Sequence, residues 1–504
     1  MSTHTPHESA ISGETTPPAP DAVTQIGGQV RKAVFWRTGS QLVAQTISWS
    51  ATLIVIRLLN PADYGLFAMA QVMMTFLDFL NGYGFASALI QSKEVSRHAI
   101  RQALGIMMLL NGSIAALQYL LAPTVAAYYG KPEVEQLLHT LAFIYLATPF
   151  IIVPEVMLSR SLHFHKQAIV NLTAAMVGAI TSLSCAYAGY GVWTLVYAPL
   201  ALFATRAIGL TFAARLFVLP TFDFRGAGHI IRFGGALMLS HLFWVIQSQS
   251  DIFIAGRKFS AHDVGLYSEA VFLTQLVMAK FVPALNQVAF PAYSRLQDDP
   301  AAIRWSFLSS IQLVILATAP IFIGIAASAE PIVEVLFGEK WLAMAPLMQM
   351  LGLAMPLMTL QIMFAPVSNA LGRPDRAVRT SLCGALLFAA SFWLGAQSGN
   401  LGLATAWLIG APLLLLITIY IHGRVSGVSI TDVAGAALPG LGCALVMGAI
   451  VRMVDWLGAD HLHGAVHLAL LVAIGGAAYA ALSWQFQRAT VRRFIGVIRR
   501  KDAG

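Results

Sequence analysis

Long runs of apolar residues alternate with short polar breaks along almost the whole chain. Most runs reach about 20 residues or more, the length that an α-helix needs to cross a hydrocarbon core of about 30 Å. The breaks carry residues that end helices, as at Asn60-Pro61, Gly130-Lys131-Pro132 and Gly372-Arg373-Pro374. The pattern predicts an all-α polytopic membrane protein with about fourteen transmembrane helices, over residues 38–59, 65–91, 102–128, 134–159, 166–187, 191–216, 228–254, 264–293, 303–328, 342–371, 377–397, 401–423, 433–454 and 464–485.

The basic residues alternate with the predicted helices in a regular way. If the N-terminus lies in the cytoplasm, most of the 31 Lys and Arg residues fall in segments that face the cytoplasm. Such an excess of positive charge is typical of cytoplasmic loops. The chain is therefore expected to cross its membrane an even number of times, with both termini in the cytoplasm.

Composition supports a membrane protein and argues against several other classes. Apolar residues make up 57% of the chain and charged residues 11%, against roughly 25% charged residues in a soluble domain. The three cysteines, Cys185, Cys383 and Cys443, lie in separate apolar runs, so neither a disulfide nor a metal site is expected. The chain has no phosphate-binding Gly-x4-Gly-Lys-Ser/Thr stretch, and its predicted external loops are short, so we expect a transporter without a cofactor rather than an enzyme.

Two polar tails flank the apolar part of the chain. Residues 1–30 are rich in Ser, Thr and Pro, which predicts a disordered cytoplasmic tail. Residues 488–504 form a basic cytoplasmic tail in which arginines alternate with apolar residues at helical spacing. This spacing favours an interfacial helix on anionic membrane lipids over a nucleic-acid site.

A repeat at an offset of 200 residues divides the chain. Residues 54–70 read IVIRLLNPADYGLFAMA, and residues 254–270 read IAGRKFSAHDVGLYSEA. The two segments lie six predicted helices apart, so the two halves have the same orientation in the membrane. We expect two parallel six-helix lobes around a central cleft, over 31–219 and 220–427, followed by two extra helices over 428–487.

The residues shared by the two repeat segments are interpreted as structural. The arginines are expected to cap helix ends or to pair with the nearby aspartates, and the glycines to permit a tight turn or a close approach. These residues are Arg57, Asp63 and Gly65 in the first segment and Arg257, Asp263 and Gly265 in the second.

The repeat segments also carry a resemblance to a known family. IRLLNPADYGLFAMA (56–70), SDIFIAGRKFSAHDVGLYSEA (250–270), FPAYSRLQDD (290–299) and FGEKWLAMAPLMQMLGL (337–353) resemble segments of Wzx-type polysaccharide exporters. The resemblance is closest to the colanic-acid and exopolysaccharide branch, and it extends from Arg31 to about Arg488. These exporters belong to the MOP superfamily, together with MATE drug exporters and lipid II flippases.

This resemblance implies a MATE-like fold and a location in the bacterial inner membrane. It implies a flippase that moves a polyprenyl-pyrophosphate-linked oligosaccharide for exopolysaccharide or O-antigen-type synthesis, by ion-coupled alternating access. The alternative is a MATE-like multidrug exporter or an exporter of another lipid-linked precursor. A monomer is expected to function alone or beside a polysaccharide polymerase and export complex, with no nucleic acid involved.

Three charged residues fall well inside predicted helices. An ionised side chain near the bilayer centre costs about 2.5–3.5 kcal/mol on insertion scales, so it is expected to face a cavity or a partner. Asp78 and Lys280 lie at nearly equivalent positions of the two repeats, which suggests either a pair that breaks during transport or a static bridge. Arg206 and Lys280 are candidates for binding a pyrophosphate, although packing or snorkelling toward the membrane surface is the alternative.

Further polar residues in the predicted helices complete the candidate site. His241, Gln249 and Asn286 are candidates to line a sugar-binding cleft, or else to join helices by hydrogen bonds. Asp78, Asp251 and Glu269 are the acids that are candidates to carry the coupling ion, which the residues leave open as a proton or sodium.

Overall fold

The computed structural model describes the backbone of residues 20–78, 96–222, 228–458 and 464–501, and the side chains of most of them. These residues form helices and no β-strand. The first lobe, which we call the N-lobe, consists of α1 (Pro20–Leu58), α2 (Pro61–Asp78), α4 (Arg97–Tyr129), α5 (Glu133–Leu141), α6 (Phe143–Ala147), α7 (Pro149–Arg160), α8 (Phe164–Tyr187) and α9 (Trp193–Ala214).

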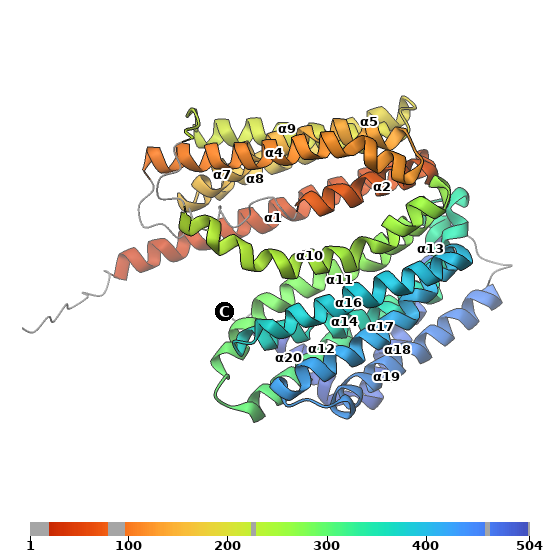
Figure 1. Ribbon diagram of the computed structural model, residues 1–504. Helices are drawn as coiled ribbons and strands as arrows, with labels where there is room; N and C mark the ends of the chain where they lie inside the picture. Colours follow the sequence, from red (N-terminus) through yellow and green to blue (C-terminus); the bar gives the residue numbers. More distant parts are fainter. Residues whose placement is uncertain (1–19, 79–95, 223–227, 459–463, 502–504) are drawn as a thin grey trace, which may run out of the picture.

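The second half of the chain, which we call the C-lobe, repeats this order and then adds three helices. It consists of α10 (Gly228–Lys258), α11 (Ala261–Arg295), α12 (Pro300–Ala327), α13 (Ala329–Leu336), a 3-10 turn (Glu339–Met344), α14 (Ala345–Ile362), α15 (Phe364–Ala370), α16 (Pro374–Gly395), a second 3-10 turn (Ala396–Ser398) and α17 (Gly399–Ser426). The added helices are α18 (Ile430–Gly458), α19 (Gly464–Phe486) and α20 (Arg488–Lys501). Figure 1 shows α1 to α9 as one bundle and α11 to α19 as another, with α10 between them.

Each of the fourteen predicted ranges falls on helix in the described residues. Nine stretches of those residues are long and apolar enough to cross a membrane, one of which joins α16 and α17. The long helices outside this set are α1, α2, α10 and α11, and these are also the helices on which the lobes meet.

Two boundaries differ from the sequence prediction. α1 begins at Pro20, inside the range expected to be a disordered tail. Residues 330–341, expected as an external loop, instead contain the short helix α13 and the start of a 3-10 turn. This segment folds because Ala329, Val333 and Trp341 are fully buried in the main core.

The two lobes meet where the repeat segments touch, and we call this contact the lobe junction. A Cβ atom on Gly65 would lie 1.8 Å from the carbonyl oxygen of Ala261, and one on Gly265 would lie 1.7 Å from the carbonyl oxygen of Pro61. Both distances are far below van der Waals contact, so α2 and α11 approach each other backbone to backbone. This is the close approach that the two glycines predict.

The repeated arginines cross the lobe junction in opposite directions. Arg57 donates to the carbonyl oxygens of Val335 and Leu336 at the end of α13, and Arg257 donates to the carbonyl oxygen of Tyr128 at the end of α4, at 2.7 Å. Each arginine therefore caps the C-terminal end of a helix in the opposite lobe, where a positive charge is favourable.

The repeated aspartates stay within their own lobes. Asp63 accepts from the Asn60 backbone N–H at 2.9 Å, at the start of α2. Asp263 accepts from the Ser260 hydroxyl at 2.6 Å, at the start of α11. Both carboxylates thus stabilise the first turn of the helix that carries the junction glycine.

We expect Gly65→Ala and Gly265→Ala each to destabilise the protein, because the added methyl group overlaps backbone atoms of the other lobe. Overpacking of this kind costs roughly 1–3 kcal/mol. The measurement is the melting temperature of the purified protein in detergent. Gly112→Ala in α4 is the matched control, since its Cβ would meet nothing within 4 Å. Equal melting temperatures for Gly65→Ala and Gly112→Ala would contradict the close approach.

Candidate functional site

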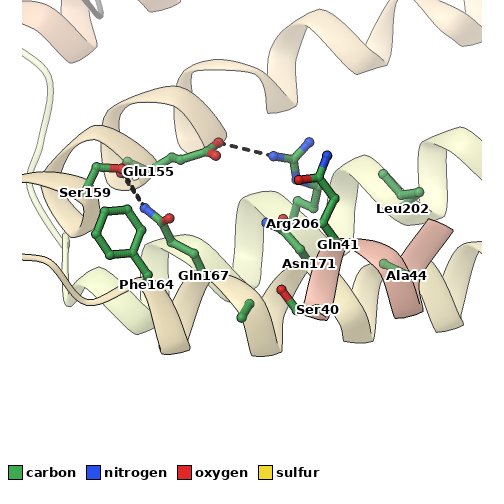
Figure 2. Close-up of a pocket in the computed structure, with 11 residues that line it drawn as sticks. Ser40, Gln41, Ala44, Glu155, Ser159, Phe164, Gln167, Asn171, Leu202 and Arg206 are labelled. Carbon is green, nitrogen blue, oxygen red and sulfur yellow. Dashed lines mark hydrogen bonds and ion pairs between the residues drawn. The ribbon is translucent and has the colours of Figure 1, made fainter. Parts of the chain in front are cut away.

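A polar cavity lies inside the N-lobe, and we call it the N-lobe cavity. Its volume is about 380 Å³, and its walls come from α1, α7, α8 and α9. Figure 2 shows that the side chains of Glu155, Arg206 and Gln41 extend into the same space from three different helices. A second cavity of about 360 Å³, lined by α2 residues that include Asp78, shares both Glu155 and Arg206 with the first. The two charged side chains therefore stand where the two cavities meet.

Arg206 and Glu155 form an ion pair at this meeting point. The Arg206 Nη2 atom lies 3.2 Å from Glu155 Oε2, and the two side chains are 26% and 39% exposed. Attraction between the charges is stronger here than at a protein surface, because membrane helices surround the pair. The pair satisfies the expectation that Arg206, inside a predicted helix, faces a cavity or a partner.

Amide and hydroxyl groups surround the ion pair. Gln167 donates from Nε2 to the carbonyl oxygen of Glu155 at 2.8 Å and to Ser159 Oγ at 2.9 Å. Two further polar atoms, Asn171 Oδ1 and Arg206 Nε, are buried without a hydrogen-bond partner among the described residues. One is an acceptor and the other a donor, and both belong to residues that line the N-lobe cavity. Neither atom is accessible to water, so both belong to the packed wall of the cavity.

The N-lobe cavity reaches the middle of α1, whereas the lobe junction lies at the C-terminal end of this helix. Ser40 lines the cavity, whereas the carbonyl oxygen of Leu58 accepts from Lys340 of the C-lobe at 3.1 Å beside the junction. At a rise of 1.5 Å per residue, these two positions are about 27 Å apart along the helix. The cavity and the junction are therefore separated by about five turns of α1.

Lys280 reaches across to the N-lobe, but its contact there is with α1. Its Nζ atom donates to Gln45 Oε1 at 3.1 Å and lies 5.7 Å from the centre of the Trp49 ring. Gln45 directly follows Ala44, which lines the N-lobe cavity. Asp78 lines the second cavity instead, so a pair between Asp78 and Lys280 stays a prediction for another conformation.

The other candidate residues are not brought into these two cavities. Asp251 is fully buried in the C-lobe, where Tyr267 donates to Oδ2 at 3.0 Å and the Ile252 backbone N–H donates to Oδ1 at 2.7 Å. Gln249 in α10 and Glu269 in α11 are partly buried. The side chains of His241 and Asn286 lie outside the described residues. The described residues contain no cluster of three or more His, Cys, Asp or Glu that could hold a metal ion.

Several cavity residues were missed by reasoning from the sequence, chiefly Glu155, Gln167 and Asn171. Glu155 follows Pro154 within the apolar run PFIIVPEVMLSR, one turn before the basic Arg160. An acidic residue inside such a run is itself a signal. Its position close to the predicted helix end at residue 159 also fits an interfacial residue, so the sequence alone does not place it at a cavity.

Comparison with solved structures defines the class of the protein. The lipid II flippase MurJ in an inward closed conformation superposes with a TM-score of 0.68 at 13% identity, over 89% of this chain and 99% of that one. An inward-facing multidrug resistance MATE transporter of the MOP superfamily superposes with a TM-score of 0.58 at 17% identity, over 76% of this chain and 95% of that one. The chain thus has the MATE-like fold of these membrane transporters.

Sequence comparison then gives the family. Residues 54–346 match the family described as polysaccharide biosynthesis protein, and the chain belongs to this family of membrane transporters. A relative from Rhizobium meliloti (strain 1021), the succinoglycan biosynthesis transport protein ExoT, is 24% identical over 93% of this chain and 96% of its own length. The lipopolysaccharide biosynthesis protein WzxC of Escherichia coli (strain K12) is 22% identical over 71% of this chain and 73% of its own length.

We expect Arg206 and Glu155 to be energetically coupled in the folded protein. Arg206→Met leaves a partly buried carboxylate without its cation, so the additional change Glu155→Gln is expected to restore part of the lost stability. A double-mutant cycle on thermal stability is expected to give a coupling energy of about 1 kcal/mol. Strict additivity of the two single effects would show that the ion pair does not form.

Proposed function

We propose that this chain is a flippase that carries a polyprenyl-pyrophosphate-linked oligosaccharide across the bacterial inner membrane. The observation that carries the proposal is the polar N-lobe cavity, which lies about 27 Å from the lobe junction along α1. A cargo of this kind needs a polar site for its sugars and phosphates within a membrane protein. Family membership and the names of the relatives point to the same class of cargo.

The two lobes suit alternating access. Two parallel repeats can rock against each other, closing one side as the other opens. The positive-inside pattern assigns the N-lobe cavity to the cytoplasmic side and the lobe junction to the external side. With this assignment, the structure represents a conformation that accepts cargo from the cytoplasm. The same assignment puts both termini in the cytoplasm.

The chemistry of the N-lobe cavity fits the polar part of the cargo. Its lining combines an arginine, a carboxylate, amides, hydroxyls and one aromatic ring, that of Phe164. Sugar hydroxyls both donate and accept, so they can form hydrogen bonds with lining groups such as the Gln41 amide and the Ser40 hydroxyl. The Arg206 guanidinium is also suited to a phosphate oxygen, in place of Glu155.

A multidrug exporter or an exporter of another lipid-linked precursor on the same fold is the second candidate. An exporter of organic cations needs an apolar site with unpaired acidic groups, whereas the carboxylate of Glu155 is paired with an arginine. This pairing favours an anionic or neutral polar cargo. A polymerase and export complex is the natural recipient of that cargo, and one monomer contains both lobes that the proposed cycle needs.

The proposal is tested by transbilayer movement of a labelled polyprenyl-pyrophosphate oligosaccharide in proteoliposomes. We expect the reconstituted protein to accelerate this movement, and Arg206→Ala to reduce it about tenfold or more, as the loss of a charge-assisted contact implies. Arg215→Ala is the control, because Arg215 is exposed at the end of the same helix, outside the cavity. Vesicles that export ethidium while the oligosaccharide stays in place would instead support the drug exporter.

We further propose that Asp251 carries the coupling ion. It is 0% exposed, and no Lys, Arg or His of the described residues forms an ion pair with it. If Asp251 exchanges a proton with the cytoplasm and exterior, Asp251→Asn is expected to abolish the acceleration caused by an imposed proton gradient while leaving movement without a gradient intact. Unchanged acceleration in Asp251→Asn would remove Asp251 from the coupling mechanism.

A further inference from the structure

A groove separate from the proposed cargo site lies between α12 and α20. One face of α12 lines it over about three turns, and Arg493 of α20 closes it from the other side; its volume is about 360 Å³. The lining residues on α12 are Ala301, Arg304, Trp305, Leu308, Ser309 and Gln312. The groove therefore begins at the N-terminal end of a helix that is apolar enough to cross the membrane.

Two guanidinium groups stand at the groove and are held by protein contacts. Arg304 Nη2 donates to Asp432 Oδ1 of α18 at 2.6 Å, and Arg493 Nη1 donates to Ser309 Oγ at 3.0 Å. Each contact uses one nitrogen of its guanidinium, and no further protein acceptor binds either group within the described residues. The remaining N–H groups are thus available for oxygens of a bound anion.

The two carboxylates near the groove already accept hydrogen bonds from other groups of the protein. Asp432 also accepts from the Ser429 backbone N–H at 2.9 Å, and Asp299 accepts from the Ala301 and Ala302 backbone N–H groups at the start of α12. These carboxylates fix Arg304 and the helix end in place. On the side of α20, the exposed Arg492 adds positive charge beside Arg493.

The rest of the groove is suited to a lipid. The Trp305 side chain is 65% exposed, and the Arg493 guanidinium lies 5.4 Å from the centre of its ring. Tryptophan is enriched where lipid headgroups meet the hydrocarbon. Below it, Leu308 continues the groove along α12 toward the membrane interior. Cationic groups at the surface end and apolar groups deeper in match the two parts of a phospholipid.

We propose that this groove binds an anionic phospholipid of the membrane leaflet that contacts α20. Its phosphate diester lies between Arg304 and Arg493, and an acyl chain runs along α12 beside Trp305 and Leu308. The bound lipid joins α20 to α12, so the basic C-terminal helix has a defined lipid site in addition to its general attraction to the membrane surface. This inference is independent of the cargo that the two lobes carry.

The test is native mass spectrometry of the purified full-length protein, titrated with phosphatidylglycerol in detergent. Phosphatidylcholine with the same acyl chains tests the need for net negative charge, and soluble glycerol 3-phosphate tests whether a phosphate alone is enough. We expect one phosphatidylglycerol to bind more tightly than either comparison ligand. Arg304→Ala with Arg493→Ala is expected to weaken that binding about fivefold for each guanidinium removed.

Arg492→Ala is the matched control, since it removes the same charge from the adjacent position of α20 outside the groove. Unchanged binding in this control supports the site, whereas an equal loss indicates general attraction to a basic helix and overturns it. Equal affinity for phosphatidylcholine or for glycerol 3-phosphate also overturns it. If the double variant fails to fold, Arg493→Gln and Trp305→Ala, each tested alone, are expected to weaken phosphatidylglycerol binding, and wild-type binding in both overturns the proposal.

Discussion

At the lobe junction, neither glycine leaves room for a Cβ atom, so α2 and α11 meet through their backbones. This contact sets the distance between the lobes at one end, and the two arginines secure it by capping helices on opposite sides. The contact is part of the main hydrophobic core, which packs Tyr64 of the N-lobe against Trp341 of the C-lobe, so opening it exposes apolar surface as well as breaking the arginine hydrogen bonds. The repeat thus supplies a contact between the lobes whose two halves are matched in sequence and in structure.

The ion pair of the N-lobe lowers the free-energy cost of placing charged side chains inside a membrane protein. An isolated charge in a span is costly, and the pairing of Arg206 with Glu155 reduces that cost while keeping both groups at a cavity. In the C-lobe, Asp251 is satisfied by neutral donors instead. One lobe therefore offers a site for a polar ligand, and the other holds the fully buried Asp251 inside its packed interior.

The sequence predicts the two lobes and their junction, but it does not predict the partner of Lys280, the helix α13 or the position of Glu155 at a cavity. The lobes and the junction are predictable because a gapless repeat preserves Gly65 and Gly265, whose lack of a Cβ atom fits a tight turn or a close approach. The partner of Lys280 was not predictable, since a repeat offset gives depth in the membrane but not the rotation of each helix about its axis. α13 was missed because eight residues are too few for a span, and Glu155 because it lies close to a helix end.

The central claim is that the lobe junction opens during each transport cycle, and a cleavable crosslink tests it most directly. In a background without the three native cysteines, Tyr128→Cys and Arg257→Cys are joined across the junction by a short disulfide-containing linker. The account predicts that oligosaccharide movement stops when the linker is in place and returns on reduction. A linker between Tyr119→Cys and His139→Cys, whose native rings stack at 3.9 Å within the N-lobe, is expected to leave movement unchanged. Movement at the full rate with the lobes linked across the junction would contradict the account.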